Sequence, residues 1–379
     1  MAIAEFQLSR KMIDWIASVG GVTTNTLAEQ LMPKKQEQFL KGNVNKTTAE
    51  KLAKIANIPF GYLFLDHPPH AKKPPVPDLR QSVNPVDLTK DFYDTFNDVI
   101  YKVDWYKDHL LDFGISYNLD FIGKFTLSND PHDVAKNICD TIKFDIKSIL
   151  KTVTKDSYFG IACKLIEDAG ILVFKNGVVK NNNKRKLNTD EFRGFCIIDK
   201  QVPAVFINGS DAYSAQVFTL FHEVAHLWIG KAGVSNWSFE SKIEAYCNKV
   251  AAEVLMPSST FCKKWEEESS VGLDAQYIIG HIANHFRVSN YAAAVKAKNL
   301  GLIDEQVFLI IRKMSLASKK PESSGGNPYA SYPYKNSPKL TDAVLSSAIT
   351  QKIPLREASN LLNIQSSTVI ELFKKRNFK

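Results

Sequence analysis

Two histidines and a glutamate in this sequence have the spacing of a metal-dependent catalyst. His222 and His226 stand four positions apart in the apolar segment 218–228 (FTLFHEVAHLW), whose pattern favours a helix. Positions i and i+4 share one face of a helix, so both imidazoles can bind the same zinc ion. Glu223 lies beside them, where it can take a proton from a metal-bound water. We predict a Zn²⁺ site with His222 and His226 as ligands and Glu223 as the general base.

Such a site needs a third protein ligand, which we expect on a neighbouring helix. The segment 238–253 favours a helix and offers Glu240, Glu244 and Glu253. Glu244 follows the second histidine by 18 positions, which leaves enough chain for a turn and an antiparallel return. Glu240 lies nearer the loop, and Glu253 projects from roughly the opposite side of the helix. Glu244 is therefore the predicted ligand, and Asn248, one turn later, is the predicted hydrogen-bond partner of a ligand imidazole.

The alternative interpretation of such histidines is structural, because two histidines on an amphipathic helix can be packed core residues. A second pair, His281 and His285, has the same spacing but lacks the intervening glutamate. We interpret this second pair as partly buried structural histidines. Tyr213 and Tyr246 lie near the first pair in the sequence, but the sequence does not assign an oxyanion donor.

The elements that must position the site are a mixture of helices and short strands. Apolar runs at 170–174, 194–198 and 203–207 are bounded by turn residues and are typical of strands in a small sheet. The run 194–198 is a candidate to pair with an extended peptide substrate. Further helices are predicted at 90–112, 132–140 and 158–168, and again from residue 214.

The N-terminal residues 8–66 have the pattern of short helices joined by tight turns. The segment 24–31 begins with N-cap residues, and residues 47–50 (TTAE) form a capping box that opens a later helix. Two short helices across a tight turn, the second polar and basic outside, favour a DNA-binding helix-turn-helix; a bundle for protein contacts is the alternative. The candidate DNA-binding residues are polar or basic and lie between these helices: Lys34, Lys35, Gln36, Gln38 and Lys41.

Changes in composition divide the chain into segments. Residues 68–87 are rich in proline, and residues 319–338 are rich in proline, serine, glycine and tyrosine, which is typical of linkers. Beyond the second linker, residues 354–369 repeat the helix-turn-helix pattern. The predicted organisation is an N-terminal domain 1–67, a linker 68–87, a central metal-binding domain 88–318, a linker 319–338 and a C-terminal helical module 339–379.

The net charge is concentrated at one end of the chain. The 48 Lys and Arg residues against 40 Asp and Glu residues give +8 over 379 residues. Residues 312–379 contain 12 basic and 4 acidic side chains, so the whole excess lies there and residues 1–311 are neutral. A basic end favours a nucleic-acid or acidic partner, and a solubilising role is the alternative.

Cysteine usage and hydropathy point to a reducing compartment. The five cysteines are scattered without a Cys-x-x-Cys pair, which indicates neither a disulfide framework nor a cysteine-rich zinc site. The first residues lack the pattern of a signal peptide, and no apolar stretch approaches the roughly 18 residues that span a bilayer. We expect a cytoplasmic protein without a membrane partner.

The metal-site segments resemble a known family. The stretch 218–226 resembles the zinc helix of the ImmA/IrrE family of metallo-endopeptidases, and 244–257 (EAYCNKVAAEVLMP) resembles its second helix. Residues 77–80, 192–195 and 286–289 are similar to further family landmarks. The N-terminal segment is similar to the Cro/repressor type of helix-turn-helix that often accompanies this peptidase. The resemblance covers roughly residues 8–315.

This resemblance implies that the central domain is a zinc metallopeptidase. It implies that His222, His226 and Glu244 bind Zn²⁺ and that Glu223 is the general base. Many members have aspartate at the position of Asn248 in this chain. The implied activity is cleavage of a regulatory protein, such as a repressor or an antitoxin-like regulator.

Together these observations predict a mainly helical α+β protein. Its parts are an N-terminal helix-turn-helix bundle, a zincin-like peptidase domain with a small sheet, and a small C-terminal helical module. The predicted partners are a protein substrate and double-stranded DNA, bound through the N-terminal or C-terminal helices. The alternative function is a DNA-binding transcriptional regulator, or an antitoxin-like binding protein, whose metal site is structural or sensory.

Overall fold

The computed structural model describes residues 5–19, 22–56, 58, 60–68, 88–152, 155–231, 234–235, 242–270, 272–317 and 328–377. The chain is mainly helical with two small sheets, an α+β protein as predicted. It divides into two compact units, residues 1–74 and 75–379, each of which is described by itself. The predicted linker 68–87 and the landmark 77–80 lie almost wholly outside the described residues.

The N-terminal unit packs short helices against a two-stranded sheet. Thr23 caps the second helix by accepting a hydrogen bond from the Thr26 N–H, at the start predicted for this segment. The predicted capping box at 47–50 is wrong, because the helix begins at Lys46 and Asn45 Oδ1 accepts from the Thr48 N–H at 2.8 Å. The elements are β1 (Glu5–Gln7), α1 (Arg10–Val19), α2 (Thr24–Leu31), α3 (Gln36–Leu40), β2 (Asn43–Asn45), α4 (Lys46–Ala56) and the 3-10 helix η1 (Phe60–Phe64).

The larger unit is built around a four-stranded sheet of order β3-β5-β4-β6. The strands β3 and β5 are parallel, whereas β4 is antiparallel to both of its neighbours, β5 and β6. Three of the strands lie within two residues of the predicted apolar runs. Their bounds are β3 (Leu172–Asn176), β4 (Gly194–Ile197), β5 (Ala204–Asn208) and β6 (Val234–Ser235).

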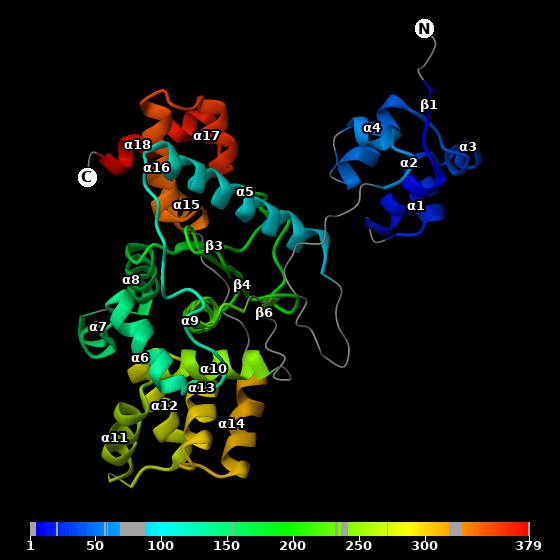
Figure 1. Ribbon diagram of the computed structural model, residues 1–379. Coiled ribbons are helices and arrows are strands. Elements are labelled where there is room, and N and C mark those ends of the chain that lie inside the picture. The colour runs from blue at the N-terminus through cyan, green and yellow to red at the C-terminus, as the bar shows by residue number, and fades with distance from the viewer. Residues whose placement is uncertain are drawn as a thin grey trace. The chain divides into compact units, whose positions relative to one another are not determined.

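Both faces of this sheet are buried, which explains why its strands are apolar runs rather than alternating ones. Val173 and Val205 pack on the face covered by α9 (Tyr213–Ile229), whereas Phe174 and Phe206 pack toward α5 (Lys90–Asp112). Figure 1 shows α5 and the C-terminal helices on one side of the strands and α9 on the other. The sheet therefore presents one complete face to the predicted metal helix.

Further helices pack around α9, with α8 also against β3 and with α10 to α14 on the side of α9 away from the sheet (Figure 1). The predicted segments 132–140 and 158–168 correspond to α6 and α8, which the structure extends by a few residues. These helices are α6 (Pro131–Ile142), α7 (Ile146–Thr152), α8 (Lys155–Asp168), α10 (Lys242–Leu255), α11 (Ser258–Ser269), α12 (Ala275–Phe286), α13 (Asn290–Asn299) and α14 (Glu305–Ala317).

The C-terminal segment is helical, as expected, but its helices begin within the range predicted as the second linker. The range 319–338 contains helix α15 (Pro328–Lys335), which begins with a proline at a position where its missing N–H costs nothing. The following helices pack on α5 through a shared core, and buried Lys102 Nζ donates to Asn336 Oδ1 at 2.8 Å. These helices are α16 (Pro338–Ile349), α17 (Leu355–Leu362) and α18 (Ser366–Asn377).

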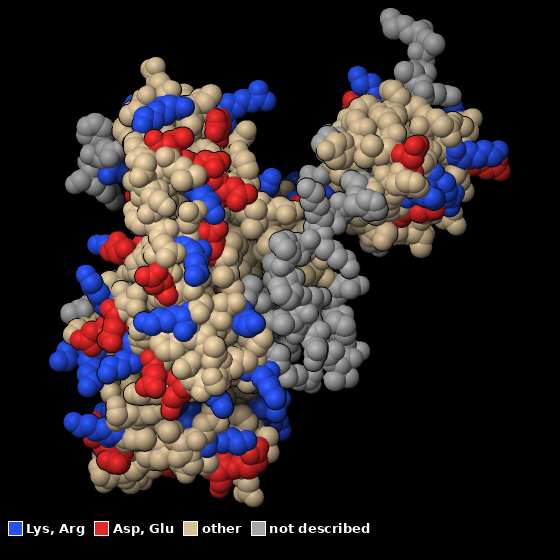
Figure 2. Space-filling model, in the orientation of Figure 1, with Lys and Arg blue, Asp and Glu red and all other residues tan. Residues whose placement is uncertain are grey.

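Charged side chains of both signs share the surface of the larger unit. Lys and Arg lie among Asp and Glu over the face of the larger unit drawn in Figure 2. No helix in the described ranges is long and apolar enough to span a membrane.

Candidate metal centre

The metal helix α9 is buried along its length between the sheet and α10. Every residue from Gln216 to Ile229 is buried, so the polar side chains of the helix lie away from solvent. It ends at Gly230, which has φ of 62° and lies so close to Gly123 that a Cβ would sit 2.9 Å from the Gly123 Cα. Glycine suits this position for two reasons: it adopts the left-handed backbone readily, and it has no Cβ to collide with Gly123.

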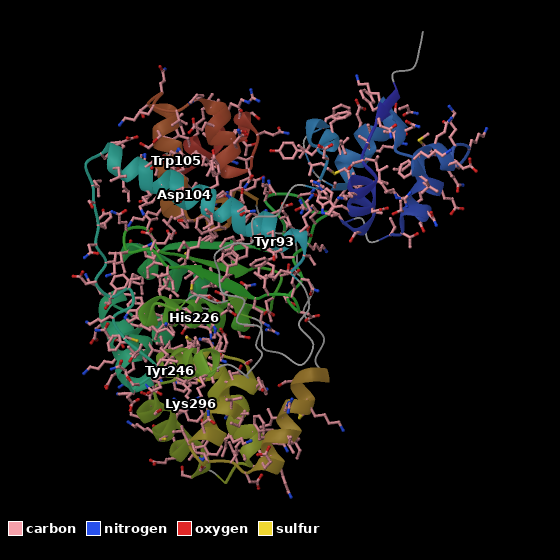
Figure 3. The ribbon with its side chains drawn as sticks, turned by 45° about the vertical axis from the view of Figure 1, so that its right-hand side comes forward. Tyr93, Asp104, Trp105, His226, Tyr246 and Lys296 are labelled. Carbon is pink, nitrogen blue, oxygen red and sulfur yellow. The ribbon has the colours of Figure 1, made fainter. Side chains whose placement is uncertain are left out.

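The structure brings His222, His226 and Glu244 together inside the protein. His222 Nε2 lies 3.1 Å from His226 Nε2 and 3.0 Å from Glu244 Oε2, and His226 Nε2 lies 3.2 Å from Glu244 Oε1. Their relative exposures are 4%, 0% and 4%. Figure 3 labels His226 between the sheet and the lower helices, with Tyr246 of α10 further from the sheet. Among the described residues this is the one group of three such side chains able to hold a metal ion.

The spacing of these three donor atoms fits zinc. Ligand bonds of 2.0–2.1 Å in a tetrahedron place neighbouring donor atoms about 3.3 Å apart. The observed separations of 3.0–3.2 Å are close to that edge length, and two nitrogens with one carboxylate are a donor set of catalytic zinc sites. The residues present therefore fit a zinc ion with one coordination position left for water or substrate.

A backbone carbonyl orients one of the two imidazoles. His226 Nδ1 lies 2.7 Å from the Lys231 carbonyl oxygen. A carbonyl oxygen only accepts hydrogen bonds, so Nδ1 carries the proton and the lone pair of the neutral ring is on Nε2. That lone pair faces His222 and Glu244. The sequence does not predict this contact, because it is made by a backbone atom just after the end of α9.

Asn248 does not take the predicted role. No hydrogen bond joins Asn248 to His222 or His226 within the described part of the chain, and the asparagine is only half-buried. His222 Nδ1 is buried without a hydrogen-bond partner among the described residues. The prediction assigned this role to an asparagine, whereas the observed contacts of His226 are with the Lys231 carbonyl and with the side chain of Cys247.

The electrostatics of Glu244 suit a ligand. Burial alone raises the pKa of a carboxyl group, because the charged form is desolvated. The imidazoles of His222 and His226 outweigh this effect and hold the pKa of Glu244 well below its usual value. The carboxylate is therefore charged at neutral pH, which is the state that binds a cation.

Glu223 lies on α9 against strand β4. Its side chain is fully buried, and a Cβ at Gly194 would sit 2.9 Å from Glu223 Oε1. The same Cβ would also lie 2.8 Å from the carbonyl oxygen of Phe206. Glycine at position 194 thus leaves the room that Glu223 occupies. The sequence placed Gly194 in a strand but not next to this carboxylate.

Glu253, another candidate glutamate, is not part of the cluster. Glu253 accepts hydrogen bonds from the Ser258 N–H and hydroxyl and forms a close ion pair with Lys296. His132 Nδ1 also lies 3.0 Å from Glu253 Oε1. Glu253 therefore joins α10 to α6, α11 and α13. Glu240 lies outside the described residues.

Neither tyrosine near the histidines is placed as an oxyanion donor. Tyr213 Oη accepts a hydrogen bond from the Phe159 N–H at 2.6 Å, and Tyr246 Oη donates to the Asn129 carbonyl at 2.9 Å. The second histidine pair is more exposed than predicted: the His281 side chain is 52% exposed and pairs with Glu268 at 2.9 Å, and His285 is also exposed.

Strand β4 is not free at both edges. Gly194 and Phe195 pair with β5 on one side and with Ser235 and Val234 of β6 on the other. The prediction that 194–198 pairs with an extended substrate is therefore wrong for these two positions, since β6 already occupies that edge. A two-residue strand after an irregular loop carries too little pattern to be predicted.

The predicted DNA-binding residues of the N-terminal unit are all exposed. They flank or belong to α3, which has five residues and buries Phe39. The exposed set is Lys34, Lys35, Gln36, Gln38 and Lys41.

Two family models match the chain. Residues 166–298 match the peptidase M78 model, described as an IrrE N-terminal-like domain, and this range contains β3 to α12 with the whole His–His–Glu cluster. Residues 336–375 match a domain of unknown function, DUF8813. No curated protein and no solved structure matches. The central part of this chain is thus similar to a metallopeptidase domain, a family whose activity implies a bound metal ion.

Proposed function

We propose that this protein is a zinc-dependent endopeptidase with a zincin-like catalytic domain. The observation that carries the proposal is the cluster of His222, His226 and Glu244, whose donor atoms have the separations of a tetrahedral zinc site. The match of residues 166–298 to a metallopeptidase family supports the same conclusion. Structural zinc sites use four protein ligands, whereas three protein ligands are typical of catalytic ones.

The metal ligands, Glu223 and the Lys231 carbonyl have different roles in the proposed reaction. A zinc ion held by the three ligands supplies a Lewis acid, which polarises a carbonyl and lowers the pKa of water to about 7. As a water attacks the peptide carbonyl carbon, Glu223 would receive the proton of that water and pass it to the leaving amine when the C–N bond breaks. The Lys231 carbonyl holds the imidazole of His226 in the tautomer that binds metal.

The proposed substrate is a regulatory protein, such as a repressor or an antitoxin-like regulator, and the proposed location is the cytoplasm. The resemblance to ImmA/IrrE peptidases supports this choice. The N-terminal unit supports it as well, since α2 and α3 are two short consecutive helices, with Gln36 and Gln38 exposed on α3 and Lys34, Lys35 and Lys41 exposed beside it.

The test is the substitution Glu223→Gln, which keeps the shape of the side chain and removes the base. The purified variant should bind zinc in the same 1:1 ratio as the wild type, while cleavage of the products of adjacent genes falls by at least about 100-fold. Equal cleavage by both proteins would exclude Glu223 as the base. Failure of the wild type to cleave any of these products, with zinc bound, would overturn the regulatory substrate.

A second candidate function is a DNA-binding regulator whose metal site is structural or sensory. The exposed Lys34 and Lys35 beside α3 favour it. In that case Glu223→Gln leaves regulation of the target genes unchanged, whereas removing zinc alters it.

A further inference from the structure

The last three helices form a small module with no part in the proposed peptidase site. Residues 336–375 match a domain to which no function is assigned. Helices α16, α17 and α18 enclose a common core in which Ala358, Leu361, Val369 and Leu372 are at most 1% exposed. Helix α16 also packs against α5, so α17 and α18 lie at the outer end of the larger unit (Figure 1).

The connection between α17 and α18 has the geometry of a helix-turn-helix. Helix α17 ends at Leu362 and α18 begins at Ser366, which leaves a three-residue turn. The first turn residue, Asn363, is left-handed with φ of 53° and ψ of 38°, a conformation that asparagine tolerates better than most residues. The second, Ile364, is buried in the core, and its N–H donates to the Ser359 carbonyl at 3.1 Å. A turn of three residues between two short helices has the length found in this motif.

The turn is fixed to the body of the protein. Asn363 Nδ2 donates to both carboxylate oxygens of Asp98 on α5, at 3.0 and 3.1 Å. On α17, Glu357 Oε1 accepts a hydrogen bond from Trp105 Nε1 at 3.2 Å. Figure 3 shows Trp105 on α5 beneath the C-terminal helices. The module is therefore held rigidly, as a surface that docks into a groove requires.

Helix α18 is amphipathic, and its exposed face carries polar side chains together with Ile370 and Glu371. Val369 and Leu372 point into the core, while Ser367, Ile370 and Lys374 are exposed at helical spacing on the other side. The helix has 12 residues and is about 18 Å long, which suits entry into the major groove of DNA. Its first residues, with Gln365 before them, carry hydroxyl and amide groups of the kind that hydrogen-bond to base edges.

The charge of this module is basic. Residues 338–377 contain six basic side chains and three acidic ones; Arg376 pairs with Asp342, and Glu357 accepts a hydrogen bond from Trp105. Arg356 on the first turn of α17 and Lys374 on the last turn of α18 are exposed. Basic side chains are visible over these helices in Figure 2. Residues 1–66, in contrast, have eight basic and six acidic side chains.

We propose that α17 and α18 are a DNA-binding helix-turn-helix, with α18 as the helix that enters the major groove of double-stranded DNA. Arg356 and Lys374 contact phosphates on either side of the groove, and Gln365, Ser366 and Ser367 face the base edges. Duplex RNA is excluded as the ligand, because its major groove is too deep and narrow for side chains to read. This site is independent of the proposed peptidase activity and lies at the opposite end of the chain from the predicted N-terminal DNA-binding residues.

The test measures binding of the full-length protein to a fluorescently labelled 30-base-pair DNA duplex of mixed sequence, by anisotropy between 50 and 200 mM salt. The double variant Arg356→Glu, Lys374→Glu should bind at least about 10-fold more weakly than the wild type, with the slope of log K against log salt reduced by about 2. The control Lys136→Glu, Lys263→Glu makes the same change in net charge at exposed positions of α6 and α11, and should bind as the wild type does.

Several outcomes overturn the proposal. One is the absence of duplex binding by the wild type at 50 mM salt, and another is an equal loss in the control variant, which would show an effect of net charge alone. A third is binding that is abolished by Lys34→Glu, Lys35→Glu but unchanged by the Arg356, Lys374 variant. Equal binding of an RNA duplex would also exclude the major-groove geometry. Circular dichroism and the unfolding midpoint verify that each variant is folded.

Discussion

The protein contains two histidine pairs with identical spacing, and the structure places them in opposite environments. His222 and His226 on α9 are at most 4% exposed and converge with Glu244 of the next helix. The His281 side chain on α12 is 52% exposed and its partner is Glu268, which the nearby Lys264 also contacts. Both helices present two imidazoles on one face.

The i, i+4 spacing of two histidines is thus compatible with a metal site, but burial of the pair beside a carboxylate is also required. Beside α9, Glu244 of α10 is buried and faces both imidazoles, so its charge is available to a metal ion. Beside α12, Glu268 of α11 is already paired with Lys264. The contrast is open to direct measurement, because each residue of the α9 site has a counterpart near α12.

The largest expected effect is loss of metal from the α9 pair alone. His226→Ala removes one of three ligands and should reduce the zinc content from one ion per chain to nearly none after dialysis. His285→Ala should leave the zinc content unchanged. Elemental analysis of the two variants measures this, and a zinc loss of similar size in both would contradict the assignment.

The two carboxylates give the next contrast. Glu244→Gln replaces a charged ligand with a weak neutral one and should lower zinc affinity by more than about 100-fold, beyond the range seen for residues that only orient ligands. Glu268→Gln should not change the affinity. A competition titration with a chelating dye determines both constants, and an unchanged constant for Glu244→Gln would remove it from the ligand set.

A pair of glycines tests the position of Glu223. A Cβ at Gly194 meets Glu223 Oε1 and the Phe206 carbonyl within 3 Å, whereas Gly280 on α12 has open space around it. Gly194→Ala should therefore lower proteolysis by about 100-fold with zinc still bound, because the base is displaced. Gly280→Ala should keep full activity and raise stability by about 0.5–1 kcal/mol, since alanine favours the helix. Full activity of Gly194→Ala would show that Glu223 tolerates the displacement.

The smallest expected effect concerns Glu253, which is buried like Glu244 but serves structure. Lys296 and Ser258 lower its pKa from 4.5 to about 2 against the opposing effect of burial. A lowered folded-state pKa stabilises the protein above pH 4.5, and this contribution disappears as the pH falls from 4.5 through 2. Glu253→Gln should cost about 2 kcal/mol at pH 7, and less toward pH 2, in urea unfolding of the chelator-treated proteins. Its zinc affinity should match that of the wild type; a loss of zinc would make Glu253 a fourth ligand.

Local patterns predicted the elements around the site well. The segment 24–31 was predicted as a helix and is α2, and 90–112 was predicted as a helix and is α5. The three apolar runs became β3, β4 and β5 with small changes at their ends. These features depend on side-chain periodicity and capping, which neighbouring residues determine.

The predictions that failed concern partners far apart in the chain. Asn248 was expected to orient an imidazole, but the Lys231 carbonyl does so, and backbone atoms have no sequence signature. The range 319–338 was predicted as a linker from its composition. Its second half forms α15 next to β3, because Lys175 and Tyr334 supply packing that only the folded chain provides.

The sequence by itself determined the zinc-binding chemistry: the i, i+4 imidazoles, the adjacent Glu223 and a helix with glutamates at a suitable distance. Those features follow from helical geometry, which is local. Only the tertiary structure decided that Glu244 rather than Glu253 meets the histidines, that Gly194 makes room for the base, and that the second histidine pair stays in solvent. Each of these outcomes depends on which surfaces pack together, because packing sets the burial and the neighbours that determine the charge and reach of a side chain.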